Sequence, residues 1–333
     1  MIKRLTRNIF SIKSHEQLEA LSLEVFKFQY KNNPVYQDFV DNLGIKDHDV
    51  SSIRDIPFLP VEVFKAHRVV SSTREPEAIF VSSGTTGGTV SRHEIVDLSI
   101  YENSFTTCFE LFYGKISNFC ILALLPSYLE NSESSLIYMV NHLIRKGSNP
   151  ESGFFLDNMQ ELVEKLGALS NKGEYILLFG VSFALLDLMN QVNNTSINWS
   201  NIIVMETGGM KGKRKEIIRE DLHNQLKEVC AVDNIHSEYG MTELLSQSYS
   251  KGQGVFYSPP WKKVLIRDIN DPLSYVEHGK RGGINIIDLA NIYSCSFIAT
   301  ADLGVAYSNG SFEVLGRFDN SDLRGCNLLL ESV

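Results

Sequence analysis

The stretch "EYILLFGVSFALLDLMNQV" (residues 174–192) joins an apolar, strand-like run directly to a helical pattern. The same alternation continues on both sides, with "FCILALLP" (119–126), "SSLIYMVNHLIRKG" (134–147) and "NIIVMETGG" (201–209). Strands that alternate with helices of this length predict a largely parallel sheet covered by helices on both faces. We therefore predict an α/β fold, with the alternation beginning at Ala78.

Outside this region the pattern changes. Residues 15–31 predict an amphipathic helix, because apolar side chains recur there every three or four residues: Leu18, Leu21, Val25 and Phe28. After about residue 249, short apolar runs with turn signals and no helical period predict a smaller, mostly antiparallel β subdomain. We divide the chain into an N-terminal helical region (1–75), an α/β core (76–249) and a β-rich subdomain (250–333).

Composition limits the possible functions. The 333 residues carry a formal net charge of -9, so no basic footprint for nucleic acid or anionic lipid is expected. No apolar stretch reaches the roughly 18 residues that span a bilayer, and the N-terminus lacks a signal-peptide pattern. The five cysteines are odd in number, widely spaced and without a CxxC pair, which argues against disulfides and zinc. A cytoplasmic protein without membrane insertion is expected.

The stretch "FVSSGTTGG" (80–88) is the first candidate for a binding site. Its glycines permit close backbone approach, and its hydroxyls and amides can converge on phosphate oxygens. It lacks the Walker spacing and lysine, so a polar hairpin turn is the alternative interpretation. The candidate phosphate-binding residues are Ser82, Ser83, Gly84, Thr85, Thr86 and Gly87.

Further candidates follow along the chain. In "EYGMTE" (238–243), Tyr239 can stack on a base, Thr242 can contact a phosphate and Glu243 can hold magnesium. Each single residue also has a purely structural interpretation, such as a turn residue or a surface charge. The other candidates are Asp302 for ribose hydroxyls, Arg317 and Asp319 in "GRFD", and Gly208 and Gly209, against whose bare backbone a flat base can lie.

In their order and spacing, S-G-T-T-G, Y-G-x-T-E, T-x-D and G-R-x-D resemble the motif series of the adenylate-forming superfamily of acyl-CoA synthetases and luciferases. Several segments resemble the acyl-protein synthetase family more narrowly: "IPFLPVEVFKAHRV", "SSGTTGGTVSRHEI", "EYGMTELLSQSY", "PPWKKVLIRD" and "VLGRFDNSDLRGCNL". That family includes the fatty-acid-activating component of the bacterial bioluminescence fatty-acid reductase. The resemblance covers the chain from about residue 20 to its end.

The resemblance implies the large-domain architecture of adenylate-forming enzymes and activation of a carboxylic acid with ATP and Mg²⁺ to an acyl-adenylate. It implies capture of the acyl group on a cysteine as a thioester, then transfer to a reductase or carrier protein. The phosphate loop carries over to residues 82–87, base and metal contacts to Tyr239, Thr242 and Glu243, and the ribose contact to Asp302. Arg317 carries over as a ribose or phosphate contact.

Cys326 in "LRGCNL" matches the acylated cysteine of the family. A neighbouring cation such as Arg324 would increase the thiolate fraction of this thiol. The structural alternative is a small apolar residue that fills a gap, as is expected of the other four cysteines.

Two features depart from the wider superfamily. The Pro-Lys that commonly follows S-G-T-T-G is replaced by Thr89 and Val90, which leaves Arg92 as the nearest cation in sequence. The chain also ends soon after G-R-x-D, so we expect most of the mobile C-terminal domain, with its catalytic lysine, to be lacking.

Two other functional classes stay open. Gly180-x-Ser182-x-Ala184, between a predicted strand and helix, is close to the nucleophile elbow of α/β-hydrolases, with His236 or His278 as the late histidine. In an adenylating enzyme the same turn would line the acyl pocket. The second alternative is a non-catalytic relative that binds a nucleotide without turnover.

Overall fold

The chain is built from two compact units, each assembled from separate stretches of sequence. The computed structural model describes residues 2–82, 89–126, 133–156, 158–192, 197–208 and 218–318. Of these, unit 1 contains residues from 2–104, 241–246 and 257–318, and unit 2 contains residues from 105–240 and 247–256. The N-terminal helical region and most of the β-rich segment therefore belong to the same unit.

Unit 2 contains the predicted parallel sheet. Its strand order is β5 (Gly153–Phe155), β4 (Cys120–Leu124), β6 (Ile176–Val181), β7 (Ile202–Thr207) and β8 (His236–Tyr239), and every pair among them is parallel. β9 (Ser248–Ser250) pairs antiparallel with β8 and is followed by β10 (Val255–Tyr257). Every residue of β4 and β6 is buried, as expected for strands covered on both faces.

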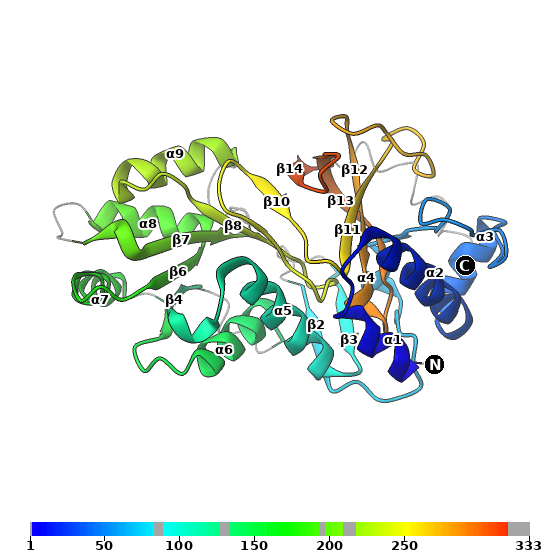
Figure 1. The fold of residues 1–333 in the computed structure, drawn as a ribbon, viewed down its shortest axis with the longest axis horizontal. Helices are drawn as coiled ribbons and strands as arrows, with labels where there is room; N and C mark the ends of the chain where they lie inside the picture. The colour runs from blue at the N-terminus through cyan, green and yellow to red at the C-terminus, as the bar shows by residue number, and fades with distance from the viewer. Residues whose placement is uncertain are drawn as a thin grey trace. The chain divides into compact units, whose positions relative to one another are not determined.

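Helices cover both faces of this sheet. α8 (Ser182–Val192) and α9 (Arg219–Cys230) lie on one face, and α5 (Leu98–Tyr113) and α6 (Ser135–Gly147) lie on the other (Figure 1). α7 (Met159–Asn171) packs against α8, and the short 3-10 helices η1 (Ile116–Asn118) and η2 (Trp199–Asn201) precede β4 and β7. Within the described ranges, no helix is long and apolar enough to cross a bilayer.

Unit 1 contains the predicted antiparallel subdomain. β11 (Lys262–Arg267), β12 (Arg281–Asp288), β13 (Phe297–Ala306) and β14 (Phe312–Arg317) pair antiparallel in chain order, and β1 (Leu59–Pro60) adds to β13 in parallel. The 3-10 helix η3 (Leu289–Asn291) follows β12 directly. The N-terminal helices of this unit are α1 (Ile2–Ile9), α2 (His15–Asn32), α3 (Pro34–Asn42) and α4 (Val63–Ala66).

The predicted helix at residues 15–31 is confirmed as α2, and Leu18, Leu21 and Val25 of its apolar face are buried. Phe28 is only half-buried, whereas Phe26 is fully buried and packs edge-on against the Phe297 ring at 6.3 Å. Gln29 is also fully buried, and its amide donates to the carbonyls of Asn291 and Ile292, each at 3.0 Å. A polar side chain therefore fixes α2 to the segment after η3.

The run that begins at Ala78 does not join the parallel sheet, so that part of the prediction is wrong. β2 (Ala78–Val81) pairs antiparallel with β3 (Arg92–Ile95) in a separate two-stranded sheet in unit 1. The apolar run is too short to reveal its pairing partner, because a hairpin strand and a short parallel strand have the same local pattern.

Gly180 serves close packing within unit 2. A Cβ at this position would lie 2.9 Å from Cδ2 of Leu185 and 3.2 Å from the carbonyl oxygen of Leu124. The glycine therefore lets α8 fold back closely onto β6.

We expect Gly180→Ala to lower the free energy of unfolding by about 1–3 kcal/mol, because it overpacks this contact. Gly167→Ala is the matched control, since its Cβ would meet no atom closer than 4.0 Å. In the interior of α7 this alanine should stabilise the protein by about 0.5–1 kcal/mol. Denaturant unfolding measures both variants, and equal stability of the two would contradict the packing role of Gly180.

Candidate functional site

The β2–β3 hairpin flanks the predicted phosphate loop. The amide of Ser82 donates to the carbonyl of Ser91 at 3.0 Å, and the amide of Ser91 donates to the hydroxyl of Ser82 at 2.9 Å. These two serines extend the hairpin by one pair beyond β2 and β3. The remaining candidates of the loop lie outside the described residues: Ser83, Gly84, Thr85, Thr86 and Gly87.

Glu243 lies against the base of this hairpin. Its carboxylate is buried and hydrogen-bonded to the side chain of Ser91. Burial raises the pKa of Glu243, and the bond from Ser91 and the positive charges of Arg317 and Lys65 oppose this rise. The structure thus brings the predicted metal ligand beside the hairpin, with cations from other segments nearby.

The backbone around Glu243 is held by buried side chains. The amide of Asn291 donates to the carbonyl of Glu243 at 2.7 Å, and its oxygen accepts from the amide of Leu245 at 2.9 Å. The carboxylate of Asp288 accepts from the amides of Leu245 and Ser246 at 3.0 and 2.8 Å. Both side chains come from the end of β12 and η3, so these elements fix the shape of the segment.

Lys262 completes this support from β11. Its ammonium donates to the carbonyl of Ser246 at 2.8 Å and lies close enough to Asp288 to stabilise the carboxylate. Burial raises the pKa of Asp288, while Lys262 and the bonds from Ser246 oppose the rise. The buried lysine and carboxylate therefore compensate each other around Ser246.

Asp302 and Arg317 are brought together by strand register. They are directly paired residues of β13 and β14, and Nε of Arg317 lies 3.5 Å from Oδ1 of Asp302. The hydroxyl of Thr300 accepts from the amide of Asp302 at 3.1 Å and donates to the carbonyl of Ile284 at 3.0 Å. The T-x-D motif is thereby fixed to the neighbouring strand. Asp319 lies outside the described residues.

Thr242 lies beside Glu243 in unit 1, and the candidates Tyr239 and Gly208 belong to unit 2. Tyr239 ends β8, is mostly buried, and packs edge-on against Phe256 with ring centroids 5.9 Å apart. Gly208 follows β7 with a φ of +65°, which glycine adopts without strain. Its carbonyl accepts a hydrogen bond from Ser182 at 2.8 Å. Gly209 lies outside the described residues.

A buried charged cluster at the end of β7 was missed in the sequence. Oε1 of Glu206 lies 3.3 Å from Nε of Arg219 and 3.6 Å from Nε2 of His223. Burial acts to raise the pKa of Glu206, but these partners outweigh it and the pKa lies below its usual range. Beside it, Thr207 donates a hydrogen bond to Glu238. The available signal was a charge in an otherwise apolar strand.

The geometry around Ser182 does not form a hydrolase triad. Ser182 is buried, and its hydroxyl donates to the carbonyl of Gly208 and to Glu206 at 3.3 Å. Glu206 lies between Ser182 and His223, whereas a triad requires the histidine between the serine and the acid. The proposed late histidine His236 instead bonds the hydroxyl of Tyr113 at 3.1 Å.

The cysteines of the described ranges are core residues, as predicted. Cys108, Cys120, Cys230 and Cys295 are all free and buried. Burial raises the pKa of Cys120 to about 11 and the pKa of Cys230 and Cys295 to about 12. Cys326 lies outside the described residues.

With this geometry established, comparison with known proteins assigns the family. The sequence profile described as acyl-protein synthetase, LuxE, matches residues 9–333. The chain belongs to the acyl-protein synthetase family. Two relatives are long-chain-fatty-acid–luciferin-component ligases, from Aliivibrio fischeri and Vibrio harveyi. The first is 24% identical over 95% of this chain and 88% of the relative, and the second is 21% identical over 96% and 89%.

Solved structures show that this acyl-protein synthetase has the fold of adenylate-forming ligases. An open form of 2-hydroxyisobutyryl-CoA ligase in complex with 2-HIB-AMP and CoA matches 93% of the chain and 72% of its own, with a TM-score of 0.65 and 12% identity. ATP-bound MatB from Rhodopseudomonas palustris matches 76% of the chain with a TM-score of 0.55 and 17% identity. The match spans half the length of MatB.

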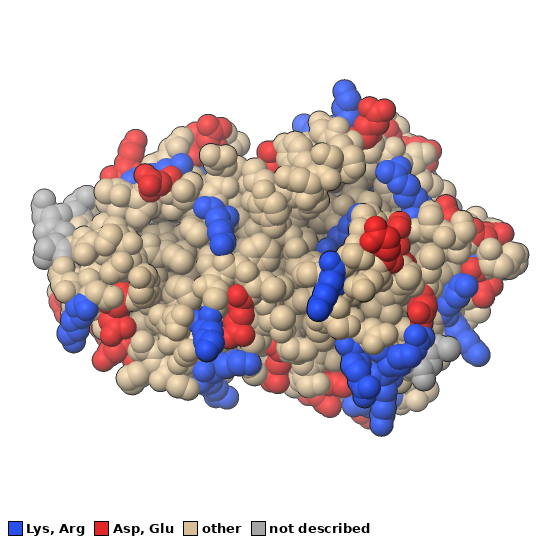
Figure 2. All heavy atoms as spheres, viewed as in Figure 1, with Lys and Arg blue, Asp and Glu red and all other residues tan. Residues whose placement is uncertain are grey.

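Charged side chains of both signs lie on the face of the protein that Figure 2 draws. Among the described residues on the face drawn in Figure 2, lysine and arginine side chains lie among aspartate and glutamate, without a continuous basic surface. In the described part of the chain, no three His, Cys, Asp or Glu side chains cluster to hold a metal ion.

We expect Ser182 to remain unlabelled by a fluorophosphonate probe, because it is buried and has no histidine to accept its proton. Mass spectrometry of the treated native protein checks this expectation, with denatured protein as the control for background reaction. Stoichiometric labelling of Ser182 in the native protein would revive the hydrolase interpretation.

Proposed function

We propose that this acyl-protein synthetase uses ATP to activate a fatty acid and captures the acyl group on Cys326. The observation that carries the proposal is the contact between Glu243 and Ser91 at the base of the hairpin that leads into S-G-T-T-G. It connects two motifs of the adenylate-forming series that lie far apart in the sequence. The fatty acid is supported by the names of the relatives, which are long-chain-fatty-acid ligases.

The proposed reaction has two steps. In the first, a carboxylate oxygen of the substrate attacks the α-phosphorus of ATP, so that an acyl-adenylate forms and pyrophosphate leaves. In the second, the thiolate of Cys326 attacks the acyl carbon, so that a thioester forms and AMP leaves. The thioester then supplies a partner such as an acyl reductase or a carrier protein. We propose a cytoplasmic site for this chemistry.

The described residues can be given roles in the first step. The hydroxyl of Ser82 and the following loop would bind phosphate oxygens, and Asp302 would accept hydrogen bonds from the ribose hydroxyls. Arg317, which is paired with Asp302, would contact ribose or phosphate. Thr242 would contact a phosphate, and Tyr239 and Gly208 would contact the base.

Mg²⁺ fits the environment of Glu243. A buried carboxylate whose pKa is raised by burial gains most from a nearby cation, and oxygen is the ligand that Mg²⁺ prefers. When bound, the ion would neutralise charge on the phosphates and on the leaving pyrophosphate. Glu243 would hold it from the protein side, while Arg317 and Lys65 supply further positive charge nearby.

We expect Glu243→Gln to lower kcat for carboxylate-dependent ATP–pyrophosphate exchange by about 10²–10³-fold, because it removes the charge that would hold the cation.

Asp302→Ala should raise the KM for ATP by tenfold or more, since hydrogen bonds to a charged group are worth about 1.5–3 kcal/mol each. Asp38→Asn, at an exposed position, is the control for loss of one charge.

The same assay tests the whole proposal. Wild-type protein that binds ATP but releases no pyrophosphate with any acid of a chain-length series would instead support a non-catalytic nucleotide-binding relative. Normal exchange in both the Glu243 and the Asp302 variants would refute the assignment of the site.

We expect Cys326→Ser to keep ATP–pyrophosphate exchange within about threefold of wild type but to lose hydroxylamine-sensitive labelling by a radioactive acid, because only the second step needs the thiol. Cys120→Ala is the control and should keep the label, since Cys120 is a buried core thiol. Labelling that persists in the Cys326 variant would assign the acceptor to another residue.

A further inference from the structure

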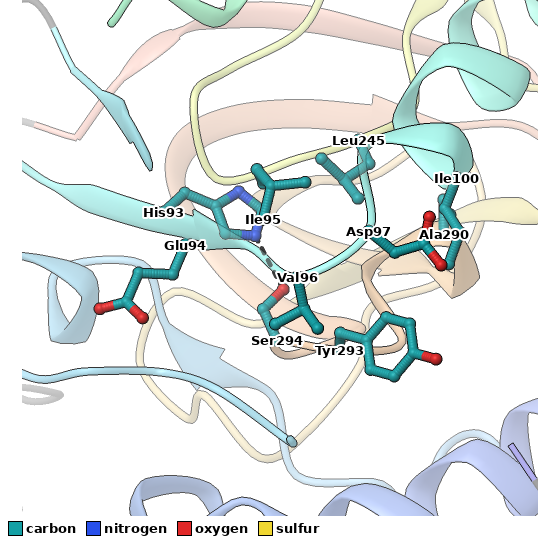
Figure 3. Close-up of a pocket in the computed structure, with 10 residues that line it drawn as sticks. All are labelled: His93, Glu94, Ile95, Val96, Asp97, Ile100, Leu245, Ala290, Tyr293 and Ser294. Carbon is teal, nitrogen blue, oxygen red and sulfur yellow. Dashed lines mark hydrogen bonds between the residues drawn. The ribbon is translucent and has the colours of Figure 1, made fainter. Parts of the chain in front are cut away.

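His93 links the β2–β3 hairpin to the segment that carries Thr242 and Glu243. It lies on β3, opposite Phe80 of β2, two residues after Ser91. Its side chain is only 1% exposed, and Nδ1 lies 2.8 Å from the carbonyl oxygen of Thr242. Nε2 lies 2.8 Å from the hydroxyl of Ser294, as Figure 3 shows. One side chain thus connects β3 to two segments that are distant from it in sequence.

These contacts determine the tautomer of the ring. A carbonyl oxygen can only accept, so Nδ1 carries the proton and donates to Thr242. In the neutral ring Nε2 then accepts from the hydroxyl of Ser294. Burial lowers the pKa of His93 to about 4, so the ring is neutral near pH 7 with both nitrogens satisfied.

The ring is also fixed by packing. Phe64 of α4 contacts it edge-on, with ring centroids 5.5 Å apart. A small pocket lies beside it, between the end of β3 and the segment around Tyr293 and Ser294 (Figure 3). Because the ring is held on several sides, a shift of β3 would be transmitted to the carbonyl of Thr242.

We propose that His93 is a positioning residue that sets the β2–β3 hairpin and the Thr242–Glu243 segment in a common register for binding Mg²⁺ and ATP. It acts through the backbone of Thr242 and would not contact the reacting atoms. The proposal rests on the proposed function and adds a residue to it. Asn291 and Asp288 hold the same segment to η3, whereas His93 holds it to the hairpin.

Asparagine and glutamine substitutions separate the two bonds of the ring. The amide nitrogen of asparagine can occupy the position of Nδ1 and donate to Thr242, whereas the amide of glutamine extends toward the position of Nε2 and Ser294. If His93 acts through Thr242, asparagine should restore function and glutamine should not. If the ring only fills space, both substitutions should behave alike.

The experiment measures thermal unfolding and ATP–pyrophosphate exchange for His93→Ala, His93→Asn, His93→Gln and Ser294→Ala. We expect His93→Ala to raise the KM for ATP and the half-saturating Mg²⁺ concentration by about 10–100-fold, the range found when outer partners of metal ligands are removed. The KM for the acid should change by less than about threefold. In His93→Asn, the KM for ATP and the half-saturating Mg²⁺ concentration should both lie within about threefold of the wild-type values. In Ser294→Ala, both should stay near the wild-type values.

Three results would overturn the proposal: an unchanged KM for ATP in folded His93→Ala, equal rescue by glutamine and asparagine, or an equal rise of the KM for acid and ATP. If the alanine variant does not fold, the comparison of asparagine with glutamine decides. Absence of exchange in wild-type protein would count against the proposed function. In that case, amide hydrogen exchange would still test the contact between His93 and Thr242. Faster exchange in His93→Gln than in His93→Asn, both in β3 and in residues 242–246, would support it.

Discussion

The segment 242–246 has no regular secondary structure. Side chains must therefore form hydrogen bonds with its buried backbone N–H and C=O groups, and the arrangement of unit 1 depends on this constraint. Asn291 and Asp288 provide most of these bonds from the end of one strand and the helical turn after it. Gln29 of α2 donates hydrogen bonds to the end of η3 and to the residue after it, and so fixes η3 to α2. A continuous series of buried polar contacts therefore connects an N-terminal helix to Glu243.

This support changes how the burial of Glu243 is understood. A buried carboxylate costs free energy, and here burial raises its pKa despite nearby cations. The backbone of the segment is already held by Asn291 and Asp288, so the fold does not need the Glu243 carboxylate for that purpose. Unfavourable burial without a structural need is typical of functional groups. Burial also raises the pKa of Asp288, but that carboxylate has a structural role, because it accepts hydrogen bonds from the amides of Leu245 and Ser246.

Local patterns predicted the parts of the fold that depend on local periodicity. The alternation around residues 174–192 correctly indicated β6, α8 and their parallel neighbours. It could not show that β2 pairs in a separate hairpin, or that Ser182 bonds Gly208 in place of a histidine. It also gave no sign of the contact from His93 to Thr242, which spans 149 residues. Motif order made Glu243 and Asp302 candidates, whereas the side chains that support them could be found only in the structure.

The acyl acceptor is constrained by the cysteines that the core contains. A thiol that takes an acyl group must be deprotonated and must reach the acyl carbon. The four cysteines of the described ranges are buried, and burial raises the pKa of Cys120, Cys230 and Cys295. Acylation of any of them would require the core to open. The fifth cysteine of the sequence, Cys326, lies outside the described residues and matches the acylated cysteine of the family, so it stays the proposed acceptor.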